Sequence, residues 1–193
     1  LAMGAAVAVI TYCVVVKHIV IGTYRPRVEP LWSLFVRRTE FVTGLFEAAA
    51  VPAGVGTLVG TPFLPPVLRL FGARIGRRTW IGTTFLTEFD LVEVGDDAAV
   101  GMNVSLQTHL FEDRVMKMST VTVQSGTSIG TRAIVLYDAV VGEGVRLGAL
   151  SLVMKGERLT PQTSWRGLPA EGLTERTTGG SSEQPPSVLD AHR

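Results

Sequence analysis

Residues 106–118, "LQTHLFEDRVMKM", concentrate ionisable side chains in a chain that is otherwise mostly small or apolar. The stretch holds one imidazole, two carboxylates and two cations: His109, Glu112, Asp113, Arg114 and Lys117. An imidazole titrates near neutral pH, so His109 is suited to act as a general base. It is equally suited to cap a turn. The four charges beside it are also what a solvated salt-bridge cluster would use, at little gain in stability.

The elements that must position His109 follow from a repeat of six residues. Aliphatic side chains recur at this step, and many precede a glycine: Ile75, Ile81, Val94, Val100, Leu106, Val123, Ile129, Val135, Val141, Leu147 and Val153. Neither a helix nor a single strand has this period. Short strands joined by tight turns do, with glycine expected where a turn needs positive φ. The pattern predicts a parallel β-helix, three strands to a coil, with coils stacked about 4.8 Å apart. The usual rule for parallel crossovers would make it right-handed.

The repeat is interrupted around residues 87–93 and again over residues 109–119. We expect the second interruption to leave the scaffold as a loop, where reactive groups commonly lie. If the first adds a single residue, Thr87 and Leu106 stack in adjacent coils, and Asp90 then lies one coil from His109. A carboxylate there would fix the imidazole tautomer and leave the other nitrogen as a base. Asp90 is the first choice for this role, and Glu88 the second.

The flanks of the repeat differ from it in composition. Residues 1–22 begin with an uncharged run, slightly shorter than the ~20 apolar residues of a membrane span, and there is no initiator Met. No basic segment precedes the run, which disfavours a signal peptide. Four arginines follow, which favours a cytoplasmic side: Arg25, Arg27, Arg37 and Arg38. We expect a truncated transmembrane or membrane-associated segment with a cytoplasmic soluble domain. A buried core helix is the alternative.

The remaining organisation is read in the same way. Residues 23–71 are predicted to be an amphipathic helical linker whose several prolines exclude a straight span, residues 72–170 the β-helix, and residues 171–193 a disordered polar tail. The net charge of +1 gives no basic field for nucleic acid. Cys13 is the single cysteine, so neither a disulfide framework nor a thiolate zinc site is expected. We expect no metal site, P-loop or dinucleotide fingerprint.

Several motifs resemble those of a known class of enzyme. "SWRGLPA" and the repeated "IG" and "VG" pairs resemble the left-handed β-helix of hexapeptide-repeat acyltransferases, which is an exception to the crossover rule. The blocks "GARIG", "TEFDLVEVGDDA", "LQTHLFEDRVMKM", "VLYDAVVG", "LSLVMKGE" and "TSWRGLPA" resemble the C-terminal region of membrane-bound nonribosomal peptide synthetases that make ε-poly-lysine and related homopolymers. The resemblance covers roughly residues 12–170.

This resemblance implies an acyltransferase-like domain that joins a carrier-bound aminoacyl thioester to the amine of an amino acid or oligomer, with His109 as the base. The thioester would be carried on the phosphopantetheine of a peptidyl carrier protein, or on acyl-CoA. Six residues are candidates to hold that arm, through phosphate contacts, backbone amides or side-chain amides: Asn103, Gln107, Lys155, Trp165, Arg166 and Gly167. Trp165 could instead cap the core, and Asn103 and Gln107 could serve turns.

Two other functions remain open at this point. The domain could be a non-catalytic β-helical scaffold that docks synthetase modules at the membrane, or a stand-alone acetyl-CoA-dependent acetyltransferase. Many hexapeptide acyltransferases are trimers with sites between subunits, whereas a synthetase with tandem domains could build that interface within one chain, so the sequence leaves both a homo-oligomer and a tandem-domain assembly open.

Overall fold

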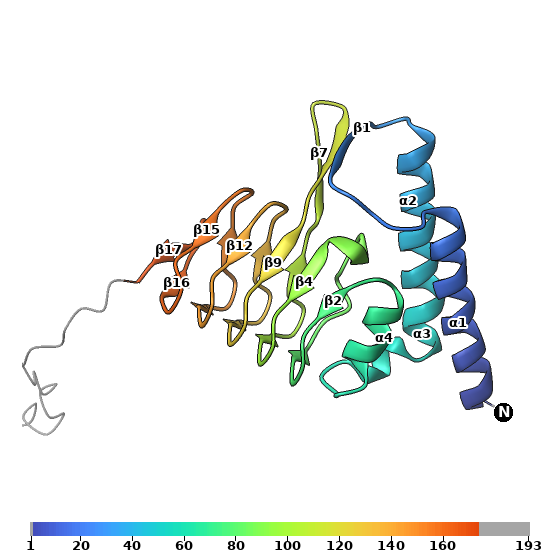
Figure 1. Cartoon of the computed structure of the whole chain (residues 1–193), viewed down its shortest axis with the longest axis horizontal. Coiled ribbons are helices and arrows are strands. Elements are labelled where there is room, and N and C mark those ends of the chain that lie inside the picture. The colour runs from blue at the N-terminus through green and yellow to red at the C-terminus, as the bar shows by residue number, and fades with distance from the viewer. Residues whose placement is uncertain (1, 174–193) are drawn as a thin grey trace, which may run out of the picture.

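The computed structural model describes residues 2–173. A layer of helices lies at one end of the molecule and a prism of stacked strands extends from it (Figure 1). The prism is the predicted β-helix. Its strands pair in parallel with the strands one coil away, and regular coils are 18 residues long, as from Val123 to Val141.

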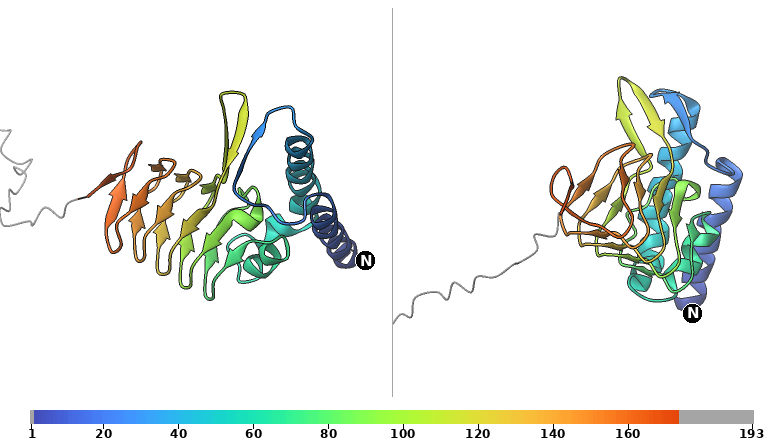
Figure 2. Two further views of the ribbon diagram at one scale, coloured as in Figure 1. Left: turned by 45° about the horizontal axis from the view of Figure 1, so that its top comes forward. Right: turned by 60° about the vertical axis from the view of Figure 1, so that its left-hand side comes forward.

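Three sheets form the faces of the prism, as Figure 2 shows in two further orientations. The first face contains β2 (Arg74–Ile75), β4 (Val92–Val94), β9 (Val121–Val123), β12 (Val140–Val141) and β15 (Arg158–Leu159). The second contains β3 (Trp80–Ile81), β5 (Ala99–Val100), β10 (Ser128–Ile129), β13 (Arg146–Leu147) and β16 (Ser164–Arg166). The third contains β6 (Ser105–Leu106), β11 (Ile134–Val135) and β14 (Leu152–Val153), and Leu86 bridges to Leu106 at its edge.

The aliphatic residues of the repeat fill the prism and are almost fully buried, as at Val100, Val135 and Val141. The glycine that follows is needed for space rather than for positive φ. A Cβ at Gly101 would lie 2.6 Å from the Ile129 carbonyl oxygen, one coil away, and a Cβ at Gly130 only 2.4 Å from the Ala149 nitrogen. Positive φ occurs instead two residues later, at Asn103 and Arg132. The predicted repeat is confirmed. The expectation that the glycine after each aliphatic residue provides positive φ is wrong.

The helical layer is built mostly from the predicted linker. It comprises α2 (Leu34–Leu45), the π-helix η1 (Phe46–Ala50), α3 (Val51–Ala53), the 3-10 helix η2 (Val55–Leu58) and α4 (Leu64–Leu70). Ser33 caps α2, with its Oγ accepting from the Val36 N–H. Helix α4 covers the first coil, where Arg69 donates from Nε to the Ile75 carbonyl at 2.8 Å. The linker is not helical throughout, because β1 (Arg27–Pro30) is a strand.

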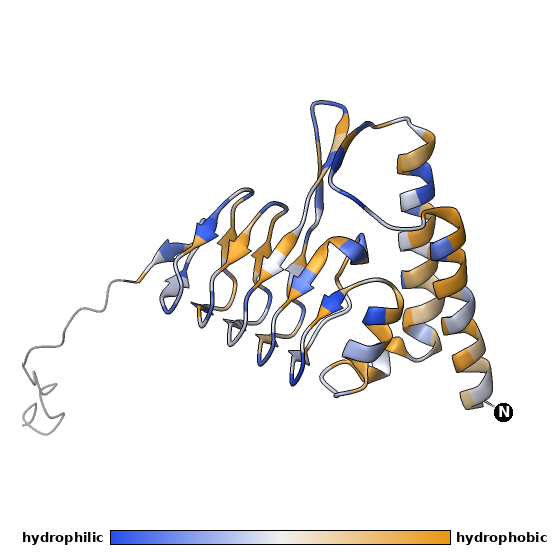
Figure 3. Cartoon of the chain, in the orientation of Figure 1, coloured by the Kyte–Doolittle hydropathy of each residue, from blue (hydrophilic) through white to orange (hydrophobic). Residues whose placement is uncertain are grey.

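Helix α1 (Ala2–Val20) is apolar along most of its length (Figure 3). Cys13 and Lys17 on one side are buried against the domain, whereas the side chains of Met3, Val7 and Ile19 are exposed. Within the described part of the chain, its segment Met3–Val20 is the one helix that meets the length and composition needed to cross a membrane. Core helices and signal sequences pass the same test.

The predicted loop at residues 109–119 is a β-hairpin that projects from the prism (Figure 1). Its strands are β7 (His109–Glu112) and β8 (Val115–Met118). Asp113 and Arg114 connect them, both with positive φ, as in a type I′ turn. Strand β1 pairs antiparallel with β8, so the N-terminal segment completes a three-stranded sheet.

The predicted disordered tail begins too early. Strand β17 (Glu171–Gly172) pairs antiparallel with β16 and continues the second face. Residues 174–193, which make up the rest of that tail, lie outside the described residues.

Candidate functional site

A histidine–glutamate pair lies where the hairpin leaves the prism. His109 is the first residue of β7, and its Nδ1 lies 2.7 Å from Oε2 of Glu88. The Glu88 side chain is fully buried, and 20 % of the His109 side chain is exposed. Because a carboxylate only accepts hydrogen bonds, Nδ1 carries the proton and donates it to Glu88. In the neutral form of the ring, Nε2 is then the nitrogen that can act as a base.

Two threonines extend this pair into a short hydrogen-bond network. The Thr108 hydroxyl donates to the same Glu88 oxygen at 2.5 Å, and the Thr87 hydroxyl lies 3.0 Å from the Thr108 oxygen. Glu88 therefore receives hydrogen bonds from two side chains that both come from the base of the hairpin. Its other oxygen, Oε1, is buried and has no hydrogen-bond partner among the described residues.

The backbone of Glu88 has a φ of 36° and a ψ of 65°, in the left-handed region, immediately before the 3-10 turn η3 (Phe89–Leu91). Nine other non-glycine residues in the described part of the chain also have positive φ, so this conformation recurs at the turns of the fold. Glu88 also acts on the buried Tyr24: burial raises the pKa of this hydroxyl, and the negative charge of Glu88 raises that pKa further.

The first choice for the orienting carboxylate, Asp90, was wrong. Its Oδ2 accepts from Nζ of Lys17 at 2.6 Å and from the Tyr24 backbone N–H at 3.0 Å. The Lys17 side chain is completely buried and also donates to the Gly22 carbonyl. Gly72 leaves the space for this ion pair, because a Cβ there would lie 2.3 Å from Asp90 Oδ1. Asp90 thus fastens α1 to the turn that carries Glu88.

The error in register has a simple origin. The assumed single extra residue aligns Thr87 with Leu106, but Leu86 bridges to Leu106 instead. The step from Ile81 to Leu86 is five positions and that from Leu86 to Val94 is eight, so one residue is lost before Leu86 and two are gained after it. In this register Glu88, the second choice, lies opposite Thr108, and its carboxylate reaches the imidazole of the next residue, His109.

Two cavities meet at His109. One, of about 380 Å³, lies on the coil side and is lined by Glu47, Phe85, Leu86, Thr87, Ser105, Leu106, Gln107, His109, Leu110 and Phe111. The other, of about 260 Å³, lies on the helix side and is lined by Thr39, Glu40, Thr43, Gly44, Glu47, His109, Phe111 and Met116. Glu47, His109 and Phe111 belong to both. The Phe111 ring stands edge-on to the imidazole at 5.1 Å between centroids.

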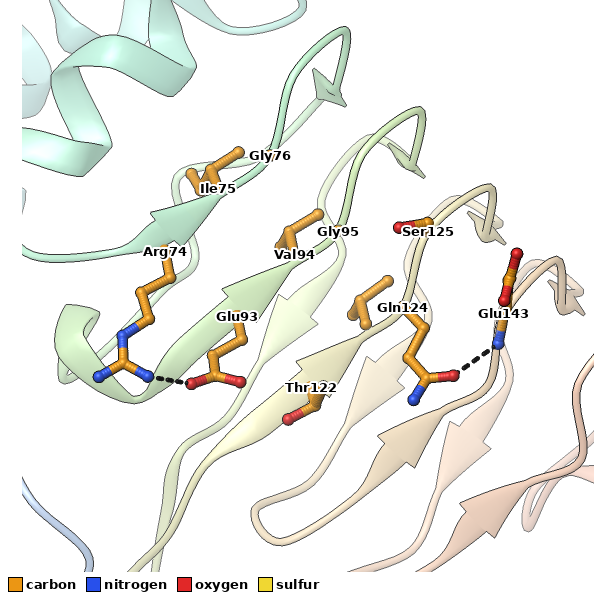
Figure 4. A pocket seen from close by; sticks show the side chains of 11 residues that line it. Arg74, Ile75, Gly76, Glu93, Val94, Gly95, Thr122, Gln124, Ser125 and Glu143 are labelled. Carbon is orange, nitrogen blue, oxygen red and sulfur yellow. Dashed lines mark hydrogen bonds and ion pairs between the residues drawn. The ribbon is translucent and has the colours of Figure 1, made fainter.

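A larger groove of about 630 Å³ runs along the first face of the prism (Figure 4). It has no lining residue in common with the two cavities at His109. Its polar side chains are largely engaged with one another: Arg74 pairs with Glu93 at 2.5 Å, and the Gln124 amide oxygen accepts from the Glu143 backbone N–H. The groove is therefore a weaker candidate for chemistry than the smaller cavities.

The predicted arm-binding residues do not form one cluster. Of the six, Gln107 lines the coil-side cavity. Asn103 is an exposed turn residue with positive φ. Lys155 is engaged with the hairpin, where Nζ lies 2.6 Å from Glu112 Oε1, and this contact lowers the pKa of Glu112. The salt-bridge interpretation of the hairpin charges is confirmed in geometry, since Lys117 also contacts Glu112 and Asp113.

The three remaining residues lie at the far end of the prism. The Trp165 indole packs against the core and donates to the Thr163 hydroxyl at 2.7 Å. The Gly167 N–H donates to Ser151 Oγ, and Arg166 is exposed. Their strand β16 is three pairings from β5, roughly 14 Å along the prism from the coil that precedes His109.

Several residues of the site were not predictable from the sequence. Thr108 and Glu47 carried no signal in the repeat, and neither did Lys17, whose partner is 73 positions away. One usable clue was a lysine inside an apolar helix, which requires a partner when it is buried. Among the described residues, no group of His, Cys, Asp and Glu is arranged to hold a metal ion.

The fold and the site together define a hexapeptide-repeat β-helix with a hairpin histidine paired to a buried glutamate. No protein-family model matches the chain. It is 46 % identical over 154 residues to delta-poly-L-ornithine synthetase of Acinetobacter baumannii (strain AB307-0294). The match covers 80 % of this chain and 12 % of the synthetase. The expected kinship with this class of synthetase is therefore confirmed for that segment.

The similarity to solved structures is more distant. A hexapeptide-repeat acetyltransferase from Vibrio cholerae is 14 % identical, with a TM-score of 0.49 over 65 % of this chain and 90 % of that one. A galactoside acetyltransferase in complex with coenzyme A is 16 % identical, with a TM-score of 0.49 over 68 % and 82 %. An N-acyltransferase from Bacillus cereus is 21 % identical, with a TM-score of 0.40 over 52 % and 59 %.

Proposed function

We propose that this chain is an acyltransferase domain that forms an amide between a carrier-bound aminoacyl thioester and the amine of an amino acid or growing oligomer. The observation that carries the proposal is the His109–Glu88 pair, in which the carboxylate engages Nδ1 of an imidazole that lines two cavities. Kinship to a segment of a poly-ornithine synthetase supports the same reaction class.

The reaction uses His109 as a general base. The amine nitrogen attacks the thioester carbonyl carbon while its proton passes to Nε2 of His109. The carbon–sulfur bond then breaks, the proton is returned to the thiolate, and a free thiol and an amide leave. Glu88 stabilises the imidazolium formed in between and keeps the ring oriented. Thr108 holds Glu88 in position through its hydroxyl.

The coil-side cavity fits the donor. Its walls include Phe85, Leu86 and Leu110, which suit an acyl chain, and Gln107 offers an amide to the pantetheine arm. The arm would reach it from carrier-borne phosphopantetheine or from acyl-CoA, along the prism past Lys155, with Trp165, Arg166 and Gly167 at the far end. The proposal includes left-handed winding of the prism and insertion of α1 in the membrane, with the β-helix on the cytoplasmic side.

The test is amide formation by the full chain in detergent, supplied with an aminoacyl carrier protein or the matching aminoacyl-CoA and an amino acid. We expect His109→Ala to lower the rate about 10²–10⁴-fold. His18→Ala is the matched control, because His18 contacts the Leu70 carbonyl away from the site. Undiminished product with His109→Ala, or equal losses in both variants, would remove His109 from the mechanism.

A further inference from the structure

We propose that the end of α1 and the start of α2 form a binding site for the headgroup of an anionic phospholipid, with Arg25 and Arg38 as the residues that hold its phosphate. The inference rests on one part of the proposed function, the insertion of α1 in the membrane, and does not depend on amide formation. It adds a ligand site that lies outside the β-helix and away from His109.

The site is a cavity of about 450 Å³ whose charge is one-sided. Three arginines line it beside apolar side chains, and none of the described residues that line it is acidic: Arg25, Arg27, Arg38, Val20, Ile21 and Phe35 are the main ones. It has no lining residue in common with the two cavities at His109 or with the groove on the first face. A guanidinium offers paired N–H donors to a phosphate, so this lining favours an anionic ligand.

Two of the three guanidiniums are available to such a ligand. Within residues 2–173, neither Arg25 nor Arg38 makes an ion pair. Arg27 is partly neutralised, because its Nε lies 3.2 Å from Oε1 of Glu29, and its guanidinium stacks on the Phe35 ring at 4.3 Å. The cavity therefore carries positive charge that its neighbours do not compensate.

The loop that carries Arg25 is held in place before any ligand binds. The Tyr24 backbone N–H donates to Asp90 at 3.0 Å, and the Tyr24 side chain is buried. The buried ammonium of Lys17 donates to the Gly22 carbonyl at 2.9 Å. Because the loop is already ordered, the binding of a phosphate there costs little conformational entropy.

The apolar surface beside the cavity fits the acyl chains of the same ligand. Helix α1 is apolar along most of its length (Figure 3), and its one lysine is buried. The large hydrophobic side chains that it exposes are Met3, Val7, Tyr12, Val15 and Ile19. Ile19 directly precedes Val20, which lines the cavity. A soluble phosphate ester would use the arginines and leave this apolar surface in water, whereas a phospholipid covers both.

An exposed tryptophan at the start of α2 supports the same ligand. Trp32 is 76 % exposed, and the Arg37 guanidinium lies over its ring at 5.1 Å. Tryptophan concentrates where a membrane meets water, and arginines close to a membrane surface attract anionic lipids. The segment that leads into α2 therefore has the composition expected at the boundary between lipid and water.

The experiment measures the lipid retained by the full chain in a neutral detergent, with native mass spectrometry as the readout. Phosphatidylglycerol and phosphatidylcholine with identical acyl chains are supplied in equal amounts. We expect the wild type to prefer phosphatidylglycerol about thirtyfold, since each arginine contributes roughly fivefold, and the double variant Arg25→Gln, Arg38→Gln to lose this preference. The matched control is Arg146→Gln, Arg158→Gln, which removes the same charge from exposed positions on the prism. Equal retention of the two lipids by the wild type, or equal losses in both double variants, would overturn the inference.

A soluble competitor distinguishes the lipid from a free phosphate ester. Glycerol 3-phosphate carries the phosphate without acyl chains, so it should displace phosphatidylglycerol only at a far higher concentration. Displacement at equal concentration would identify a soluble ligand and overturn the assignment. Neither measurement uses a thioester or an amine, so its result is independent of whether His109 catalyses amide formation. Because Arg25 and Arg38 are exposed, the double variant should unfold at the wild-type temperature.

Discussion

Removal of the buried ammonium of Lys17 provides a quantitative test of how the helical layer is joined to the site. In Lys17→Met the side chain keeps its length, but Asp90 loses its ion-pair partner. The carboxylate, 11 % exposed, retains the Tyr24 N–H as its remaining hydrogen-bond donor. Leaving a charge buried in this way costs about 3–5 kcal/mol. For a chain of this size we expect the unfolding temperature to fall by roughly 10 °C.

Removal of both charges should recover the lost stability. In the double variant Lys17→Met, Asp90→Asn no charge remains buried, and an amide oxygen still accepts from Tyr24. We expect this variant to unfold within about 1 kcal/mol of the wild type, so the two substitutions should be strongly non-additive.

Thermal and urea unfolding in detergent, followed by circular dichroism of the β-helix, measures both effects. Arg37→Met is the control, because it breaks an ion pair whose side chains are 55 % and 48 % exposed and should cost at most about 1 kcal/mol. If Lys17→Met costs no more than the control, or if the double variant loses the sum of the single losses, the buried pair does not fasten α1 to the domain.

Three further changes test neighbouring parts of the structure. Gly72→Ala should lower the unfolding temperature at least as much as Lys17→Met does, because the added Cβ would overlap the Asp90 carboxylate; an unfolding temperature equal to that of the wild type would contradict this. Thr108→Val should lower kcat and shift the pH–rate profile while KM for the donor stays constant, since the hydroxyl contacts only Glu88 and Thr87; an unchanged profile would exclude a catalytic role for this hydrogen-bond network. Lys155 lowers the pKa of Glu112, so this contact contributes stability above the ordinary carboxyl pKa and loses it as the pH falls through the lowered one. Glu112→Gln should therefore destabilise the hairpin slightly at pH 7 and not at all at about pH 2, as amide exchange in the hairpin would report.

The regular part of the fold was accessible from sequence because each coil repeats the same physical requirement. An aliphatic side chain must fill the prism at every sixth position, and a residue without a side chain must follow where the next coil passes closely. Those two demands leave a visible pattern from Ile75 to Val153. Outside the repeat the sequence did not predict the strands. The hairpin strands and their pairing with residues 27–30 have no six-residue period.

The site was found in part for the same reason. His109 stood out because it interrupts an apolar repeat, but its partner depended on a register that five- and eight-residue steps alter without any change in composition. Choosing between Glu88 and Asp90 required the position of Lys17, which approaches from a helix 73 residues earlier in sequence. Long-range contacts between single side chains are not encoded in local spacing.

The way α4 covers the first coil has a consequence for how copies of the protein can associate. A stack of parallel strands ends in unpaired backbone N–H and C=O groups, and strands of another chain could pair with them repeatedly to form a fibre. Here Arg69 binds the carbonyls of Ile75 and Gly76, and the Gly60 N–H binds that of Ile81. Head-to-tail stacking of prisms into an open-ended fibre requires both ends of each prism, so the cover at this end opposes such a fibre.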